Sequence, residues 1–167
     1  MFRLAVRPSP IGPLTLAAHG DRLVMVRFGD DRESAVRFLQ RQEPATAIVD
    51  HRDPAGAASA LVRYFNGDLN ALDSLEVDFY GTEFQRRVWT SLRSVAAGTT
   101  ASYTDIANAI GAPSATRAVG AANGANPIAI VVPCHRIIGT SGALVGYGGG
   151  LDRKRWLLEH EGILLKM

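Results

Sequence analysis

One short stretch of the sequence places a thiol, an imidazole and a guanidinium side by side. This stretch is Pro133-Cys-His-Arg136, and it holds the single cysteine of a 167-residue chain. The thiolate is the reactive form of cysteine, and nearby cations lower the pKa of a thiol. We therefore expect Cys134 to have a depressed pKa and to act as a nucleophile. The alternative is a buried structural cysteine, as many lone cysteines are.

The residues before the cysteine predict a rigid backbone for the thiol. The run Ile128–Val132 is short, apolar and rich in β-branched residues, which predicts a buried, strand-like segment. Pro133 restricts the preceding residue to extended geometry and ends the run. The thiol of Cys134 is thus expected to emerge at the end of a buried segment.

His135 is the candidate general base for this thiol. Adjacent side chains point in opposite directions on an extended backbone, so proton transfer from Cys134 needs a bridging water or a local turn. A histidine base also needs a third group that fixes its tautomer. Glu161, in the apolar segment Trp156–Gly162, is a candidate, although its side chain could equally be exposed, as we expect for Glu159.

A glycine-rich segment follows the candidate nucleophile. Residues 139–150 contain six glycines and Tyr147. The segment lacks the Gly-Lys-Ser/Thr of a phosphate-binding loop, and the pattern G-x-G-x-x-G fails at Leu151. Glycines around an aromatic residue are typical of backbone that closes over a flat ligand. The other interpretation is a flexible surface loop.

Two short helices with a tight turn between them precede the cysteine. The segment Ser102–Ile110 predicts a helix that Gly111 and Pro113 end, and Ser114 is expected to cap a second helix from Ala115 to about Asn123. This spacing is typical of a helix-turn-helix. Helix pairs with a glycine turn also occur in proteins that do not bind DNA.

The second of these helices has an unusual composition. It is built mainly from alanine and glycine, so a partner could approach its backbone closely, and it carries one long cation, Arg117, near its amino-terminal end. The dipole already favours a phosphate at that end of a helix, and an arginine there adds little to helix stability. Arg117 is therefore a candidate DNA contact, or a surface residue paired with a nearby acid.

The remaining sequence predicts an α+β chain. In the first half, turn residues separate three apolar runs that we expect to form a small antiparallel sheet: Phe2–Val6, Leu14–Ala18 and Leu23–Phe28. Two helices are expected to follow, Glu33–Gln40 and Ala57–Phe65, with a loop around residues 44–54 between them. Thr82 and Gln85 form a capping box for a further helix, in which Trp89 is expected in the core.

Composition and charge narrow the class of protein. The chain is 47% hydrophobic and 20% charged, which is typical of a globular protein, and no apolar run reaches the roughly 18 residues of a membrane span. Prolines at positions 8, 10 and 13 interrupt any signal-peptide core, so we expect a cytoplasmic protein. A single cysteine excludes an internal disulfide and a cysteine-based zinc site. We predict no metal and no cofactor.

The two halves of the chain differ in charge. Residues 1–80 hold nine arginines against eleven acidic residues, whereas residues 81–167 hold nine basic against five acidic residues. A basic second half suits an anionic partner such as nucleic acid. We expect a domain boundary here, between residues 80 and 81.

Pro133-Cys-His-Arg136, followed by Gly146-Tyr-Gly-Gly-Gly150, resembles the O6-alkylguanine-DNA alkyltransferases. Further segments occur in the same order as in that family and extend the resemblance over nearly the whole chain: Ser9–Leu16, Gly81–Trp89, Ser102–Ala107, Arg117–Gly120 and Asn126-Pro127. The resemblance implies a structural domain over 1–80, made of a small antiparallel sheet with helices. It also implies a mostly helical, winged-helix-like domain over 81–167, which binds DNA through a helix-turn-helix and transfers the alkyl group.

The resemblance also implies roles for the site residues. Cys134 would accept the alkyl group from O6 of guanine, each molecule reacting once. His135 would act as a base through water, oriented by Glu161, while Asn126 would hold the active-site turn together. Tyr103 would bind the base near its N3 atom. Other residues that would contact DNA or the base are Ser114, Ala115, Arg117, Ile137, Tyr147 and Gly148.

The implied partner is double-stranded DNA that contains O6-alkylguanine. Family members insert the helix-turn-helix in the minor groove and extrude the damaged nucleotide, with little sequence dependence. Arg117 would fill the space that this nucleotide leaves. The resemblance implies a monomer, with cooperative assembly on DNA left open. Two other functions also remain open at this stage: a Cys-His hydrolase, and a module that binds alkylated DNA without chemistry.

Overall fold

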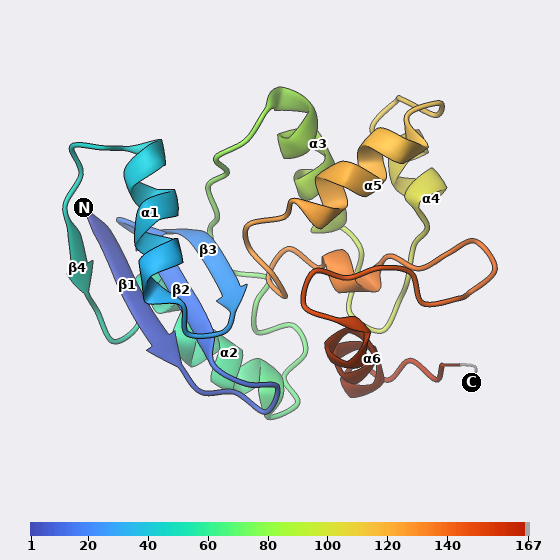
Figure 1. Ribbon diagram of the computed structural model, residues 1–167. Coiled ribbons are helices and arrows are strands. Elements are labelled where there is room, and N and C mark those ends of the chain that lie inside the picture. The colour runs from blue at the N-terminus through green and yellow to red at the C-terminus, as the bar shows by residue number, and fades with distance from the viewer. Residues whose placement is uncertain (166–167) are drawn as a thin grey trace. The chain divides into compact units, whose positions relative to one another are not determined.

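The structure is a computed structural model that describes residues 1–165 of the chain. The chain divides into two compact units, Met1–Tyr80 and Gly81–Met167. Each unit has its own elements, which Figure 1 labels. In the described part of the chain, no helix has the length and apolar character needed to cross a membrane.

A four-stranded sheet forms the base of the first unit. Its strands are β1 (Phe2–Arg7), β2 (Leu14–His19), β3 (Arg22–Phe28) and β4 (Ile48–Asp50), in the order β3-β2-β1-β4. The first three strands pair antiparallel, as predicted from the alternation of apolar runs and turn residues. This sheet forms because its strands are rich in β-branched and other apolar side chains, most of which are buried.

The fourth strand was not predicted. The sequence favoured a loop around residues 44–54, but Ile48–Asp50 pairs parallel with β1, so the sheet is mixed and not wholly antiparallel. The backbone N–H of Phe2 donates to Ala47 and that of His51 donates to Leu4, at 2.8 and 3.0 Å. Three residues are too few to produce an alternating pattern, so only this tertiary pairing defines the strand.

Two helices accompany the sheet, α1 (Arg32–Gln42) and α2 (Ala57–Phe65), with a short 3-10 turn, η1 (Pro54–Gly56), before α2. Figure 1 shows α1 in front of the sheet and α2 behind it. Two side chains of α1, Ala35 and Leu39, pack into the core cluster with side chains of the strands. The helix α2 has the bounds that its apolar spacing predicted.

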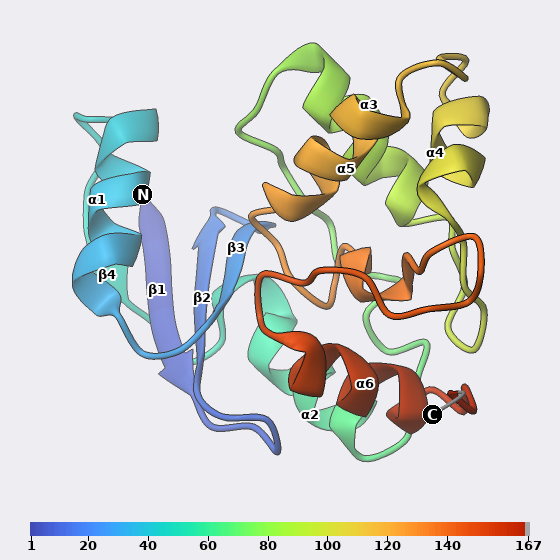
Figure 2. The same ribbon diagram turned by 45° about the vertical axis from the view of Figure 1, so that its right-hand side comes forward.

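The second unit is mostly helical. Its helices are α3 (Glu83–Leu92), α4 (Tyr103–Ala109), α5 (Thr116–Gly124) and α6 (Leu151–His160), with one 3-10 turn, η2 (Cys134–Arg136). Figure 2 shows α3, α4 and α5 grouped together. Capping boxes begin α3 at Thr82 and α4 at Ser102, the first of which the sequence predicted.

Trp89 connects two of these helices. Its ring on α3 is buried, as predicted, and its indole N–H donates a 2.8 Å hydrogen bond to the carbonyl of Ala122 on α5. A buried indole N–H needs such a partner, because leaving it unpaired would cost its desolvation energy. This contact fixes α5 against α3.

The two short helices α4 and α5 pack against each other with a tight turn between them. Gly111 takes a left-handed conformation, with φ of 74°, and the N–H of Ala112 returns to the carbonyl of Ala107 at 2.9 Å. This closure ends α4 as predicted. The prediction that Ser114 caps α5 is wrong, because Ala115 occupies the N-cap position and no side chain caps this helix. The predicted α+β fold class is confirmed.

Candidate active site

Asn126 organises the turn that leads to the cysteine. Its side-chain carbonyl accepts the backbone N–H of Ile128 at 3.0 Å. Its amide group then points the other way and donates to the carbonyl of Val132 at 2.8 Å and to the sulfur of Cys134 at 3.1 Å. The backbone bond fixes which end of the amide faces the sulfur. One side chain therefore closes the turn and contacts the thiol.

The segment Ile128–Val132 is buried as predicted, but it is a turn and not a strand. The N–H of Val132 donates to the carbonyl of Ile128 at 3.0 Å, and Ile130 has a φ of 69°. A positive φ is strained for a β-branched residue and persists only where the surroundings enforce it. The hydrogen bonds of Asn126 across the turn override the β propensity of the run.

The cysteine begins the 3-10 turn η2, so Cys134 and His135 do not lie on an extended backbone. Only 6% of the surface of Cys134 is exposed. Burial raises the pKa of the Cys134 thiol above its ordinary value, and this effect outweighs Asn126, Lys154 and Tyr147, which lower the pKa. The depressed pKa that the sequence predicted is wrong for this structure, because the thiol is desolvated and Arg136 is bonded elsewhere.

His135, Arg136 and Glu161 form a buried cluster. The Nε2 of His135 lies 2.8 Å from Oε2 of Glu161, and both side chains have no exposed surface. Arg136 donates from Nε and Nη2 to the two oxygens of the same carboxylate, at 2.8 and 3.0 Å, and from Nη1 to the carbonyl of Val95. These bonds hold the pKa of the Glu161 carboxyl far below its usual range despite its burial.

The carboxylate sets the tautomer of His135. An ionised carboxylate only accepts hydrogen bonds, so Nε2 carries the proton and Nδ1 keeps a free electron pair. Burial lowers the pKa of His135, and the charges of Arg136 and Lys154 lower it further, so the ring is neutral near pH 7. Nδ1 is buried and has no hydrogen-bond partner among residues 1–165. A neutral imidazole with one vacant acceptor is suited to take a proton.

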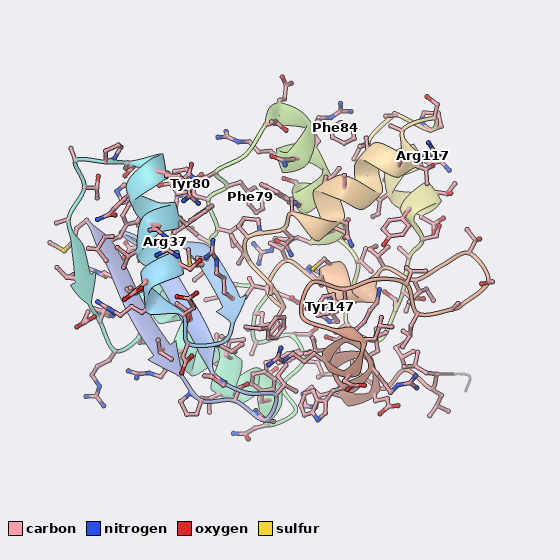
Figure 3. All side chains as sticks on the ribbon, viewed as in Figure 1. Arg37, Phe79, Tyr80, Phe84, Arg117 and Tyr147 are labelled. Atoms are coloured by element: carbon pink, nitrogen blue, oxygen red, sulfur yellow. The ribbon has the colours of Figure 1, made fainter. Side chains whose placement is uncertain are left out.

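Two tyrosines and a lysine add to the surroundings of the thiol. The hydroxyl of Tyr147 and the positive charge of Lys154 both lower the pKa of Cys134. Tyr103, the first residue of α4, has a raised pKa because of burial and the nearby Cys134, so its hydroxyl stays protonated. Its ring lies 3.9 Å from where a Cβ on Gly120 would be, so a small residue on α5 leaves it room. Figure 3 labels Tyr147 on the glycine-rich loop.

The structure thus brings together Cys134, His135, Asn126, Glu161 and Tyr147, and places Tyr103 within electrostatic reach of the sulfur. The other predicted residues lie around this group. Arg117 is exposed on the first turn of α5 and labelled in Figure 3. Ser114, Ala115 and Gly148 lie in loops, and Ile137 is buried, bridging Ala101 in a short parallel β contact. Among residues 1–165, the side-chain hydrogen bond to the sulfur comes from Asn126 and from none of these five.

Sequence reasoning missed Lys154 and misassigned Arg136. Lys154 is fully buried although it is charged, and Arg136 binds Glu161 where we expected it to add charge beside the thiol. A signal for Lys154 was present in the sequence. Lys154, Leu157, Leu158 and Glu161 follow the i, i+3, i+4, i+7 spacing of one helix face, and all four are buried.

The described residues include no group of three or more His, Cys, Asp or Glu side chains that could hold a metal ion. The chemistry that this arrangement supports comes from its own side chains. A buried thiol, a neutral imidazole with a vacant acceptor and a carboxylate that fixes the imidazole are the parts of a base-assisted nucleophile.

The Glu161→Gln variant is expected to be destabilised by about 3 kcal/mol or more at pH 7, because it leaves the buried guanidinium of Arg136 without its countercharge. The folded-state pKa of Glu161 is depressed, so its stabilising contribution is complete above the unfolded pKa and is lost as pH falls. The difference between the wild type and Glu161→Gln should therefore shrink below about pH 5. Urea unfolding of the wild type and the variant, at pH 7 and at about pH 4, measures this difference in the free energy of unfolding.

Glu159→Gln is the matched control for this variant, because Glu159 lies two residues away and is exposed. Its free energy of unfolding should stay within about 0.5 kcal/mol of the wild type at both pH values. Equal stabilities of Glu161→Gln and Glu159→Gln at pH 7 would contradict the assigned carboxylate cluster.

The comparison with protein families agrees with the motifs. The model for the 6-O-methylguanine DNA methyltransferase, DNA binding domain, matches residues 83–163. The model for the 6-O-methylguanine DNA methyltransferase, ribonuclease-like domain, matches residues 3–79. Together the two matches span most of both compact units.

Individual relatives give the same result. A methylated-DNA–protein-cysteine methyltransferase of Mycobacterium bovis is 51% identical over 153 residues, covering 92% of this chain and 88% of the relative. Its counterpart in Shigella flexneri is 45% identical and covers 94% of both chains. A crystal structure of Mycobacterium tuberculosis OGT in complex with DNA matches with a TM-score of 0.77 at 48% identity, over 96% of this chain and 91% of that one. The resemblance seen in the sequence is thus confirmed, and the chain belongs to the 6-O-methylguanine DNA methyltransferase family.

Proposed function

We propose that this protein repairs DNA by transferring the alkyl group of O6-alkylguanine to Cys134, and that each molecule reacts once. The observation that carries the proposal is the arrangement around the thiol of Cys134. Asn126 donates a hydrogen bond to its sulfur at 3.1 Å, and Glu161 fixes Nε2 of the neighbouring His135, which leaves Nδ1 to accept a proton. Family membership supports the substrate, since relatives at about half identity are named methylated-DNA–protein-cysteine methyltransferases. A DNA complex of a similar protein supports DNA as the partner.

The first step is removal of the proton from the thiol. Burial disfavours the Cys134 thiolate, so the resting sulfur is neutral and needs a base. A water between the sulfur and Nδ1 of His135 would pass the proton to the imidazole, and Glu161 would stabilise the imidazolium that forms. Asn126, which already donates to the sulfur, would stabilise its negative charge.

The second step is displacement at the alkyl carbon. The bond between sulfur and carbon forms while the bond between carbon and O6 breaks, and the guanine leaves as an anion. The proton taken from the thiol returns from the imidazolium to guanine, so His135 ends neutral. Tyr103 would donate a hydrogen bond near N3 of the base, for which its raised pKa is suited because it keeps the hydroxyl protonated.

The product explains why each molecule would react once. A thioether on Cys134 is stable, and the chain has no second cysteine that could take over the alkyl group. No further group in the proposed mechanism hydrolyses a thioether. The protein would therefore be consumed stoichiometrically by the lesions that it repairs.

Access to the lesion requires that the nucleotide leaves the helix. A base stacked in a duplex cannot present its O6 substituent to a buried sulfur, and extrusion costs a few kcal/mol. Weak pairing of alkylated guanine lowers this cost, which favours lesions over normal bases. We assign DNA binding and alkyl transfer to residues 81–167, which hold the helix pair and the thiol, and a structural role to residues 1–80.

Arg117 is assigned to the space that the extruded nucleotide leaves. It is exposed at the start of α5, and exposed alanines nearby on the same helix allow close approach of a DNA backbone. Since phosphate contacts dominate such binding, affinity should fall with salt and depend little on sequence.

Arg117→Ala is expected to slow repair of a duplex at least about tenfold, because the gap left by extrusion is then unfilled. Its reaction with free O6-benzylguanine should stay within about twofold of the wild type, since a free base needs no extrusion. Rates of protein alkylation on both substrates measure this split. Equal losses on the two substrates would contradict the assigned role of Arg117.

The proposed function is tested by incubating the protein with a duplex that holds one O6-methylguanine and analysing the nucleosides of the recovered DNA. We expect guanine to replace O6-methylguanine in proportion to the protein added. Cys134→Ala should bind the same duplex and leave the lesion intact. Recovery of unchanged O6-methylguanine after reaction with an excess of folded wild-type protein would overturn the proposal.

A further inference from the structure

The helix α6 carries a buried cation that the mechanism above does not use. Lys154 has no exposed surface. Within residues 1–165 no carboxylate forms a salt bridge with it, although the nearby Glu161 pairs with His135 and Arg136. Moving an ammonium out of water is costly unless it gains a partner, so a buried lysine without an acid partner calls for a specific reason.

The side chain of Lys154 hydrogen-bonds to the glycine-rich loop. Its Nζ donates to the carbonyl of Val145 at 2.8 Å. The same loop carries Tyr147, whose hydroxyl is close enough to Cys134 to lower the pKa of its thiol. Lys154 therefore holds the backbone of this loop at a point two residues from Tyr147.

The charge of Lys154 acts on the thiol as well. It lowers the pKa of Cys134, and the Cys134 thiolate in turn raises the pKa of Lys154. Burial is the larger effect on the lysine and brings its pKa to about 8, so it remains mainly protonated at pH 7. The same charge lowers the pKa of His135, which keeps the imidazole neutral.

The other groups around the sulfur cannot supply this charge. From α4, Tyr103 is a neutral hydroxyl, and from the turn before the cysteine, Asn126 is a neutral amide. In η2 itself, His135 is neutral and Arg136 is bonded to Glu161. Among residues 1–165, Lys154 is the cation whose charge lowers the pKa of Cys134.

We propose that Lys154 is a positioning residue of the alkyl transfer, which supplies the countercharge for the Cys134 thiolate and anchors the glycine-rich loop over the sulfur. This inference rests on the proposed function, because it assigns a residue to the same reaction. While the thiol is protonated, the only hydrogen-bond acceptor of the ammonium among residues 1–165 is the Val145 carbonyl. When the proton leaves the sulfur, the ammonium gains an opposite charge, so it favours the ionised state of Cys134 over the neutral one.

The test measures ionisation of the thiol without DNA. The rate of Cys134 alkylation by iodoacetamide is followed by mass at pH 7, where Lys154 is mainly protonated. Lys154→Gln removes the charge but keeps an N–H donor for the loop, whereas Lys154→Arg keeps the charge. Arg153→Met is the matched control, because Arg153 is the neighbouring cation on α6 and also donates to a loop carbonyl, that of Gly149 at 3.2 Å.

We expect Lys154→Gln to slow alkylation of Cys134 about tenfold at pH 7, where Lys154 is mainly protonated. Lys154→Arg and Arg153→Met should keep the wild-type rate at this pH. An unchanged rate in folded Lys154→Gln would overturn the inference, as would the same loss in Arg153→Met. If Lys154→Arg does not fold, as judged by circular dichroism, the comparison of Lys154→Gln with Arg153→Met still decides.

The proposed function is judged separately by methyl transfer from duplex DNA to the wild type. A wild type that repairs DNA, together with an unchanged alkylation rate in Lys154→Gln, refutes the role of Lys154 alone. A wild type that does not repair DNA refutes the proposed function, whatever the rate of thiol alkylation shows.

Discussion

Cys134→Ser is expected to abolish alkyl transfer, lowering the rate by more than about a thousandfold. Serine keeps the size of the side chain and can still accept the Asn126 hydrogen bond that the sulfur accepts at 3.1 Å. Its hydroxyl, however, is a far weaker nucleophile than a thiolate at neutral pH. The loss of activity would therefore result from the replacement of sulfur by oxygen and not from a change in the turn around residue 134.

Intact-protein mass over time, with a duplex that contains O6-methylguanine, measures this effect. Cys134→Ser should retain the wild-type circular dichroism spectrum and the wild-type affinity for the duplex. A methyl group that appears on Cys134→Ser at a rate near that of the wild type would mean that another side chain is the acceptor.

His135→Gln is expected to slow transfer by about a hundredfold to ten-thousandfold at pH 7, the range for loss of a general base. Glutamine can still donate to Glu161 in place of Nε2 of His135, so the carboxylate and Arg136 keep a polar partner. It has no group that takes the proton from Cys134. The difference in transfer rate between the wild type and His135→Gln should become smaller as pH rises, because hydroxide then ionises the thiol without the imidazole.

Single-turnover rates with methylated duplex, measured from neutral to alkaline pH, give this profile. The free energy of unfolding of His135→Gln is the control for this experiment, since partial unfolding of the variant would also lower the rate. A rate within about threefold of the wild type at pH 7 would show that His135 is not the base.

The parts of the fold that sequence predicted are those set by local interactions. The helix Ala57–Phe65 and the capping box of Thr82 follow from spacing and side chains within a few residues. The strand Ile48–Asp50 depends on pairing with a distant strand, so its own residues gave no signal. The run Ile128–Val132 has the composition of a strand, but the hydrogen bonds of Asn126 fold it into a turn.

The site shows the same division between local and tertiary information. The sequence pointed to Cys134 and His135 because they are adjacent and chemically distinctive. The direction of the thiol pKa was predicted wrongly, because burial of Cys134 is the largest influence and depends on residues far along the chain. The buried face of α6, which joins Lys154 to Glu161, could have been found by counting helix positions.

The central claim is that Cys134 receives the alkyl group and keeps it. The most direct measurement treats the wild type with a large excess of O6-methylguanine duplex and determines both the protein mass and the amount of guanine restored. The account predicts one added methyl group per molecule, located on the peptide that contains Cys134, and one guanine restored per molecule, after which repair stops. Continued repair of the excess DNA by protein of unchanged mass would contradict it.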